Sequence, residues 1–155
     1  MGVDFDNIRL NIKKESYDLI GTGSGRRVFD LNNGYVVKMA KNRKGIAQNK
    51  VEYQISSTAH TKIFAKVLAV SDDFIYLIME KAEKINYISD VWKYYHVRNN
   101  RELFRLNEFR NLTSKYGLLL PDLCRPYSWG LIGGRPTIID FGFTKEVRRR
   151  YYSLF

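Results

Sequence analysis

Residue types suited to binding a phosphorylated ligand occur in a definite order along this sequence. A glycine-rich stretch at 21–25 comes first, Lys38 and Glu52 follow it, and Asp140 begins an Asp-Phe-Gly sequence much later in the chain. Glycines let backbone amides approach phosphate oxygens without a side-chain clash. An aspartate at the end of a buried strand is well placed to hold Mg²⁺ against phosphates. The pattern therefore indicates nucleotide chemistry.

Each of these features has a plainer interpretation when it is taken alone. A glycine-rich stretch is typical of a flexible hairpin, and Lys38 and Glu52 are of types that usually face solvent. If Lys38 points inward, however, its ammonium needs an anionic partner, because an unpaired buried charge is very costly. Glu52 lies near apolar Val51 and Ile55 on an expected helix. We therefore predict an ion pair between Lys38 and Glu52.

The elements that must position these residues follow from hydrophobic periodicity and turn signals. Asn32-Asn33-Gly34 is a strong turn signal between two strands, since Asn and Gly tolerate positive φ. Helical spacing of apolar residues predicts the helix that carries Glu52. The expected elements are strands at 17–20, 27–31 and 35–39, a helix at 44–59, and strands at 63–70 and 74–79.

The following part of the sequence changes to helical patterns. Ser89 or Asp90 is expected to cap a short helix, and a longer helix is predicted over 103–116, with Gly117 as its stop. A proline-containing loop and a glycine hairpin then lead to the strand that ends at Asp140. Strands with one helix come first and helices second, which is an α+β arrangement with two unequal lobes.

In this order and spacing, the sequence resembles the protein kinase family over roughly residues 17–145. The matching residues are Gly21, Gly23, Val28, Lys38, Glu52 and Asp140-Phe141-Gly142. Arg27-Val28-Phe29, Val37-Lys38-Met39-Ala40 and the segment 44–49 also look like short kinase-like proteins of bacteria and bacteriophages. The resemblance implies one kinase-like domain over 1–155, with a five-stranded antiparallel N-lobe and one helix at about 1–82 and a truncated helical C-lobe at about 83–155.

The resemblance also implies roles for individual residues, with ATP and Mg²⁺ as cofactors. Lys38 would bind the α- and β-phosphates, Asp122 would accept the proton of the substrate hydroxyl, and Asp140 would hold Mg²⁺ with Ser128 as a weaker ligand. Glu52 would orient Lys38. The residues expected around the nucleotide are Gly21, Gly23, Gly25, Val28, Lys38, Glu52, Glu80 and Ala82.

Several positions depart from the family pattern. Arg26 stands where the third loop glycine is expected, and Leu120-Pro121-Asp122 replaces His-Arg-Asp. Tyr127 stands where the family has a metal-binding Asn, and the residues after Gly142 are too few to build a peptide-docking surface. These departures favour a pseudokinase that acts as an interaction or inhibitor module, whereas the presence of Lys38, Glu52, Asp122 and Asp140 favours an ATP-dependent phosphotransferase. Both interpretations stay open.

The net charge of +10 predicts an anionic partner, although it also serves simple solubility. A nucleotide and an acidic protein face fit this charge, and the basic, tyrosine-containing stretch at 145–152 leaves a nucleic-acid-binding protein as a third class. No apolar run is long enough for a membrane span. The single cysteine, Cys124, excludes an intrachain disulfide. We expect a cytoplasmic protein, in the host cytoplasm if it is phage-encoded.

Overall fold

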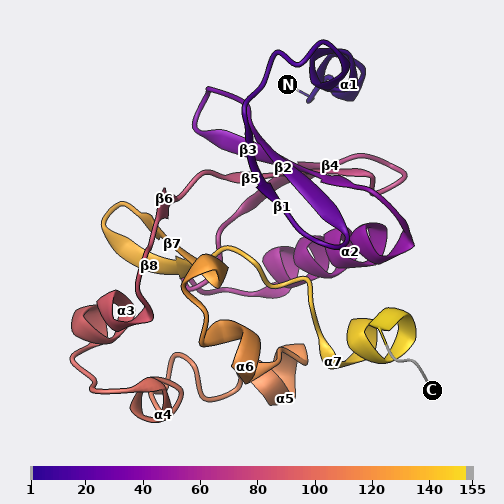
Figure 1. Ribbon diagram of the computed structural model, residues 1–155. Coiled ribbons are helices and arrows are strands. Elements are labelled where there is room, and N and C mark those ends of the chain that lie inside the picture. Colours follow the sequence, from indigo (N-terminus) through magenta and orange to yellow (C-terminus); the bar gives the residue numbers. More distant parts are fainter. Residues whose placement is uncertain (1, 153–155) are drawn as a thin grey trace. The chain divides into compact units, whose positions relative to one another are not determined.

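The described residues, 2–152 of a computed structural model, form two units that each contain a β-sheet (Figure 1). The first unit comprises Met1–Ser57 and Lys66–Lys81, and the second comprises Thr58–Ala65 and Ala82–Phe155. The chain therefore leaves the first unit after its long helix, returns to it for two strands, and then completes the second unit.

The sheet of the first unit is antiparallel and has five strands in the order β1-β2-β3-β5-β4. The strands are β1 (Leu19–Thr22), β2 (Arg26–Asp30), β3 (Tyr35–Ala40), β4 (Val67–Val70) and β5 (Tyr76–Glu80). Lys38 lies on the central strand, opposite Val28 of β2 and Leu77 of β5. The predicted meander of three strands is confirmed, and the predicted strand at 63–70 is shorter than expected.

The two faces of this sheet are covered by different helices (Figure 1). Side chains alternate between the faces of a strand, so Val37 packs with Ile8 of α1 (Phe5–Lys13), whereas Lys38 faces α2 (Arg43–Thr58). The α2 helix agrees with the prediction. The α1 helix was not predicted; the carboxylate of Asp4 caps it by accepting a hydrogen bond from the amide of Asn7 at 3.0 Å.

The turn between β1 and β2 packs directly against the beginning of α2. The carbonyl of Gly25 accepts a hydrogen bond from the amide of Lys41 at 2.8 Å, and the side chain of Asn42 donates to the carbonyl of Ser24 at 3.0 Å. A Cβ atom on Gly45 would overlap the carbonyl oxygen of Gly25. Glycine is therefore required at position 45 by the close approach of two backbones, with no contribution from an unusual φ angle.

The second unit contains a three-stranded sheet of order β6-β7-β8 and several short helices. Its strands are β6 (Glu83–Lys84), β7 (Trp129–Ile132) and β8 (Arg135–Ile138). Its helices are α3 (Ile88–Tyr95), α4 (Asn100–Leu103), α5 (Leu112–Tyr116), α6 (Leu120–Leu123) and α7 (Lys145–Val147), with a 3₁₀ turn at Pro126–Ser128 and a π-helical turn at Arg148–Tyr152. Within residues 2–152, no helix is long and apolar enough to cross a membrane.

The predicted long helix over 103–116 is wrong. Leu103, Phe109 and Leu112 are all buried as the apolar pattern required, but the chain between α4 and α5 forms successive tight turns. The amide of Leu106 bonds to the carbonyl of Leu103 at 3.2 Å, and that of Phe109 bonds to Leu106 at 3.0 Å. A spacing of three residues fits a chain of such turns as well as it fits a helix, so the apolar pattern alone could not separate them.

The predictions for helix ends in this region had different outcomes. Neither Ser89 nor Asp90 caps α3, because the helix begins one residue earlier and its N-cap is Tyr87, which makes no side-chain cap bond. Gly117 does end α5, with a φ of 70° that favours glycine. The hairpin at Gly133-Gly134 is confirmed, since it joins β7 to β8 and both glycines have positive φ.

An aromatic cluster fixes the segment that precedes β7. Trp129 is 1% exposed and packs edge-to-face on Phe109, with ring centroids 5.7 Å apart. Its indole N–H donates to the carbonyl of Leu123 at 2.8 Å. Because Leu123 ends α6, this bond ties the short helix that carries Asp122 to the first strand of the hairpin.

Substituting Gly45 by alanine tests the packing of the β1–β2 turn on α2. Alanine normally stabilises a helix interior by about 0.5–1 kcal/mol relative to glycine. Here we expect Gly45→Ala to destabilise the fold by about 1–3 kcal/mol, because the new methyl group overlaps the carbonyl of Gly25. Chemical denaturation measures the change.

Gly23→Ala is the matched control, because a Cβ atom there meets no atom within 4 Å. Its effect on unfolding should stay within about 0.5 kcal/mol. Equal effects of the two substitutions would contradict the proposed packing constraint.

Candidate functional site

A buried carboxylate with two cationic partners lies at the centre of the first unit. Glu52 is completely buried, and the ammonium of Lys38 lies 2.9 and 3.1 Å from its two oxygens. The guanidinium of Arg26 contacts the same oxygens at 2.7 and 3.0 Å, in a bidentate arrangement. The predicted ion pair between Lys38 and Glu52 is therefore confirmed, and Arg26 extends it into a triad.

Asn49 connects this triad to the segment that directly precedes β5. It is fully buried, and its side-chain oxygen accepts a hydrogen bond from Arg26 at 3.1 Å. Its side-chain amide donates to the carbonyls of Phe74 and Ile75 at 2.8 and 3.2 Å. Sequence reasoning gave Asn49 no role and treated Arg26 only as a departure from the glycine pattern. The signal available for Arg26 was a charged residue at a position where a glycine is expected.

The electrostatics of Glu52 follow from these contacts. Burial on its own raises the pKa of a carboxyl group, because it disfavours the charged form. The charges and hydrogen bonds of Arg26 and Lys38 outweigh this effect and lower the pKa of Glu52 to about 2. Glu52 is consequently a permanent anion at neutral pH, and it holds the Lys38 ammonium in a defined position.

The predicted nucleotide-contacting glycines differ in what requires them. Gly21 pairs with Val28, and the amide of Gly23 closes the turn on the carbonyl of Arg26 at 2.9 Å. A Cβ atom on Gly23 would meet nothing within 4 Å. A Cβ atom on Gly25 would instead lie 3.0 Å from the backbone nitrogen of Gly45, and 2.6 Å from the side-chain oxygen of Gln48. The packing of the protein therefore explains the glycine at position 25 and leaves the one at position 23 unexplained.

Glu80 and Ala82 lie at the end of β5 and just beyond it. Glu80 accepts a hydrogen bond from the amide of Lys66 at 2.8 Å through its side chain. Lys81 pairs with Asp30 of β2 at 2.6 Å. Ala82 already belongs to the second unit, where its methyl group packs closely over Gly130.

In the second unit, Ser128 connects Asp122 to Asp140. Its hydroxyl donates to the carbonyl of Asp122 at 2.8 Å. Its own carbonyl accepts hydrogen bonds from the amides of Ile139 and Asp140, at 2.8 and 3.3 Å. The fold thus brings together three predicted site residues that come from α6, the 3₁₀ turn and the end of β8.

The residues around Asp140 are anchored on both sides. Phe141 is 1% exposed and packs on Phe64, with ring centroids 4.8 Å apart. Before it, the amide of Ile138 donates to the carbonyl of Ile63 at 2.7 Å, and the amide of Ala65 donates to the carbonyl of Ile138 at 2.9 Å. The backbone that carries the Asp140 carboxylate is therefore rigidly placed within its unit.

The Asp122 carboxyl group is in a different electrostatic state from Glu52. Burial raises its pKa, and the nearby Asp140 raises it further, while Arg125 and Arg148 act in the opposite direction. One of its oxygens, Oδ2, is buried and has no hydrogen-bond partner among the described residues. The carboxylate is thus destabilised by its surroundings.

The Asp140 carboxylate and the Ser128 hydroxyl are oxygen donors of the kind that Mg²⁺ accepts. Magnesium prefers oxygen ligands and is typically held by one or two carboxylates, with the remaining positions filled by substrate phosphates and water. Within residues 2–152, no group of three or more His, Cys, Asp and Glu side chains gathers into a complete protein metal site.

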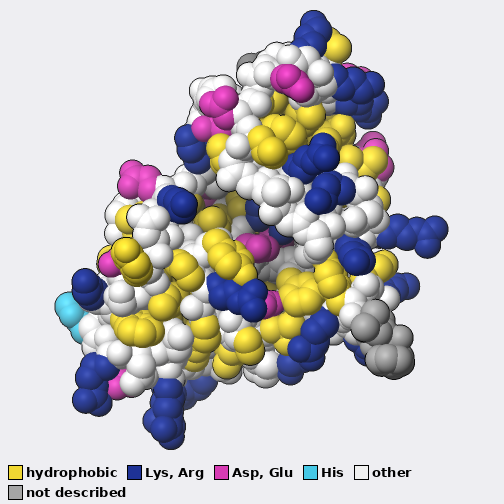
Figure 2. Space-filling view, in the orientation of Figure 1, with side chains coloured by type: hydrophobic (Ala, Val, Ile, Leu, Met, Phe, Trp, Pro, Cys, Tyr) yellow, Lys and Arg dark blue, Asp and Glu magenta, His cyan; other side chains and the backbone are white. Residues whose placement is uncertain are grey.

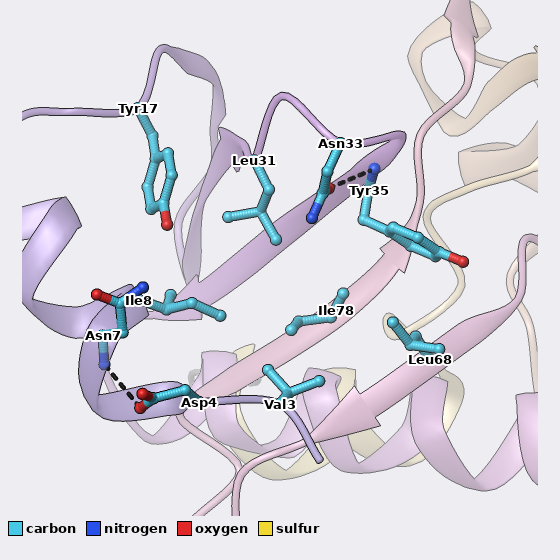
Figure 3. A pocket seen from close by; sticks show the side chains of 10 residues that line it. All are labelled: Val3, Asp4, Asn7, Ile8, Tyr17, Leu31, Asn33, Tyr35, Leu68 and Ile78. Carbon is cyan, nitrogen blue, oxygen red and sulfur yellow. Dashed lines mark hydrogen bonds between the residues drawn. The ribbon is translucent and has the colours of Figure 1, made fainter. Parts of the chain in front are cut away.

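A cavity on the opposite face of the first sheet is separate from these residues. It has a volume of about 210 Å³ and lies between the beginning of α1 and the sheet, with Ile8, Leu31 and Ile78 among its lining residues (Figure 3). Lys38 points to the other face of the same sheet. On the surface shown in Figure 2, Lys and Arg side chains are spread widely.

Comparison with known proteins gives a likeness to a solved structure only. No protein-family model matches the sequence, and no curated protein sequence matches it. Among solved structures, the chain is similar to that of the ternary complex of APH(2")-IIa with streptomycin and ATP. The two are 13% identical, with a TM-score of 0.48 and coverage of 92% of this chain and 71% of that chain.

The class of the fold follows from the chain's own architecture. A five-stranded antiparallel sheet of order β1-β2-β3-β5-β4 carries a lysine on its central strand, and a helix between β3 and β4 carries the glutamate that pairs with it. A second unit of short helices and a hairpin follows, with Asp-Phe-Gly after the last hairpin strand. The chain has a protein kinase-like fold of the α+β class.

Breaking the Lys38–Glu52 pair should be strongly destabilising. Glu52→Gln leaves two buried cations without their anion, and we expect a loss of about 3–5 kcal/mol. A double-mutant cycle of Lys38→Met with Glu52→Gln, followed by chemical denaturation, should show a coupling energy of at least about 1 kcal/mol. Additive effects would contradict a coupled pair.

The same pair predicts a pH dependence. The pKa of Glu52 is lowered from 4.5 to about 2 on folding, so its contribution to stability is present above about pH 4.5 and disappears as the pH falls toward 2. The stability difference between the wild type and Glu52→Gln should therefore shrink across this window.

Asp122→Asn should have the opposite effect on stability at neutral pH. Because the folded-state pKa of Asp122 is raised above its ordinary value of 3.8, ionisation costs stability as the pH rises through that range. Removing the charge should raise the melting temperature at pH 7, and the gain should vanish well below pH 3.8. Asp72→Asn, at an exposed turn position, is the control for the change in net charge. An equal gain in the control would contradict the prediction.

Proposed function

We propose that this protein binds ATP with Mg²⁺ and transfers a phosphoryl group to a hydroxyl of a protein or a small molecule. The observation that carries the proposal is the buried pairing of Lys38 with Glu52 on a central strand next to a glycine-rich turn. A buried ammonium is costly unless anions compensate its charge. Lys38 shares the single charge of Glu52 with Arg26, so the α- and β-phosphates of ATP would supply the further negative charge that these cations can bind.

The proposed roles are assigned to the residues of each unit in turn. In the first unit, Lys38 binds the phosphates and Glu52 orients it. The other proposed nucleotide contacts are Gly21, Gly23, Gly25, Val28, Glu80 and Ala82. The open space at Gly23 supports a close approach of a phosphate to the turn at this position, because the packing of the protein does not require glycine there.

In the second unit, Asp140 holds Mg²⁺, which neutralises charge on the phosphates. Ser128 is a weaker ligand: it donates its hydroxyl proton to the carbonyl of Asp122 and keeps its oxygen lone pairs for a cation. Asp122 accepts the proton of the substrate hydroxyl. A carboxylate whose pKa is raised toward the working pH accepts a proton more readily, which supports this role.

A pseudokinase that acts by contact is the second candidate. Tyr127 stands where the family has a metal-binding Asn, and it is 61% exposed, with its hydroxyl held by Arg125 at 2.5 Å. The tyrosine is thus turned to solvent and bonded to an arginine. In this alternative the net charge of +10 would recruit an acidic protein partner. A nucleic-acid-binding role rests on charge alone and is the third candidate.

The subgroup of kinase-like proteins, the lobe boundaries and the cellular location are also proposed. We place the chain with the short kinase-like proteins of bacteria and bacteriophages, as one domain with an N-lobe at about 1–82 and a C-lobe at about 83–155. It would act in the cytoplasm, which is the host cytoplasm if a phage encodes it. The segments 27–29, 37–40 and 44–49 support this placement.

A thermal-shift titration with Mg-ATP tests nucleotide binding. A ligand at one hundred times its Kd stabilises the native state by about 2.7 kcal/mol. For a chain of this length the melting temperature should rise by roughly 5–10 °C. The shift should be lost in Lys38→Ala and kept in Lys13→Ala, which removes an exposed lysine of α1.

The absence of any shift in the wild type at millimolar Mg-ATP would overturn nucleotide binding. If ATP binds, incubation with γ-labelled ATP separates the first two candidates. Label that enters a substrate or the chain itself, and is lost in Asp122→Asn and Asp140→Asn, identifies a phosphotransferase. Binding without transfer supports the interaction module.

A further inference from the structure

We propose that Arg26 is a positioning residue, which clamps the glycine-rich turn onto α2 and sets the orientation of the Glu52 carboxylate that holds Lys38. As far as it concerns ATP, the inference rests on the proposed function. Arg26 follows the glycine-rich turn directly, as the first residue of β2, and is 7% exposed.

The two cations of the triad contact the Glu52 carboxylate in different ways. Arg26 meets both oxygens of Glu52 with two parallel N–H donors, at 2.7 and 3.0 Å. A planar guanidinium in this arrangement fixes the plane of the carboxylate, whereas an ammonium acts as a point charge. Lys38 reaches the same two oxygens at 2.9 and 3.1 Å. The carboxylate is therefore oriented by Arg26 and presented to Lys38.

The buried face of α2 is adapted to this clamp. Its buried residues are Gly45, Asn49, Glu52 and Ile55, and the first three lie at spacings of four and three, which places them on one side of a helix. A helix that packs on a sheet usually buries apolar side chains. Here the backbone of Gly25 packs closely on Gly45. The side-chain oxygens of Asn49 and Glu52 accept hydrogen bonds from the Arg26 guanidinium.

The end of the turn is bonded to α2 and to the two residues that precede this helix. Ser24 is bonded to Asn42, Gly25 to Lys41, and Arg26 to Glu52. Opening the turn away from the helix requires the separation of a buried, bidentate ion pair. A glycine at position 26 would provide none of these side-chain contacts, so the turn would be held by its neighbours alone. The arginine converts a flexible glycine turn into a fixed one.

For a bound nucleotide, we expect Arg26 to affect the binding of the phosphates. Arg26 acts through Glu52 on Lys38 and through the backbone of the turn on Gly23 and Gly25, which are proposed nucleotide contacts. Adenosine has no phosphates, so its binding depends on neither Lys38 nor the backbone of the turn. Loss of the contacts made by Arg26 should therefore weaken the binding of ATP much more than the binding of adenosine.

Calorimetric titrations of Mg-ATP and of adenosine into Arg26→Met, Arg26→Lys and wild-type protein test this. We expect Arg26→Met to lower the affinity for ATP at least tenfold and to change the affinity for adenosine less than twofold. Arg26→Lys should recover part of the loss, because it restores the charge without the bidentate geometry. Arg27→Met is the control, since Arg27 is the next residue of β2, exposed and directed to the other side of the strand.

Amide hydrogen exchange on the same proteins gives a second readout that needs no ligand. Exchange at residues 23–26 and at the start of α2 should speed up at least tenfold in Arg26→Met and remain unchanged in Arg27→Met. If Arg26→Met does not fold, the milder Arg26→Lys protein should show the same changes in smaller size.

The possible results separate this inference from the proposed function. If Arg26→Met weakens the binding of ATP and of adenosine equally, Arg26 has only a general structural role, and the inference is overturned. Unchanged ATP affinity with unchanged exchange would overturn it as well. If the wild type binds no ATP, the proposed function fails, and the exchange data alone then confirm or overturn the clamp.

Discussion

Glu52 places a full negative charge where no water reaches it, and the architecture of the first unit is arranged around that charge. An ion of this kind costs several kcal/mol to bury unless opposite charges and hydrogen bonds compensate for it. Arg26 comes from β2, Lys38 from β3, and Glu52 itself from α2, so the compensation exists only when all three elements are in place. The polar triad therefore specifies how the helix packs on the sheet, at a point where apolar contacts alone would permit sliding.

The two units place carboxylates in opposite electrostatic situations. Glu52 is held as an anion by two cations, and its pKa falls to about 2. Asp122 is held near Asp140, one of its buried oxygens has no hydrogen-bond partner within residues 2–152, and its pKa rises. The first situation suits a group whose charge must never change, because it positions another residue. The second suits a group that has to exchange a proton or meet a cation. This contrast is the electrostatic basis for giving Glu52 and Asp122 different roles in the proposed function.

Much of the first unit could be predicted because its signals are local. Alternating apolar residues and the Asn-Asn-Gly turn indicated β1 to β3, and helical spacing indicated α2. The α1 helix was missed, because a short amphipathic segment with one capping aspartate resembles many surface segments. The region 103–116 was predicted wrongly, because its apolar side chains recur at intervals that suit both a helix and a series of turns. Which of the two forms depends on the core that receives Leu103 and Phe109, and that core includes Trp129 from far along the chain.

The pairing of Lys38 with Glu52 could be inferred from the sequence by itself, because a lysine on an apolar strand needs an anion and few were available nearby. The order of glycine turn, lysine, glutamate and Asp-Phe-Gly likewise indicated the class of fold. The sequence could not show what Arg26 does, since an arginine after a glycine turn can equally point into water. Only the tertiary structure decided this, by bringing β2 and α2 so close that the guanidinium, 26 residues away from Glu52 along the chain, meets a buried carboxylate. A long-range contact of this kind depends on the packing of both elements, which no local pattern encodes.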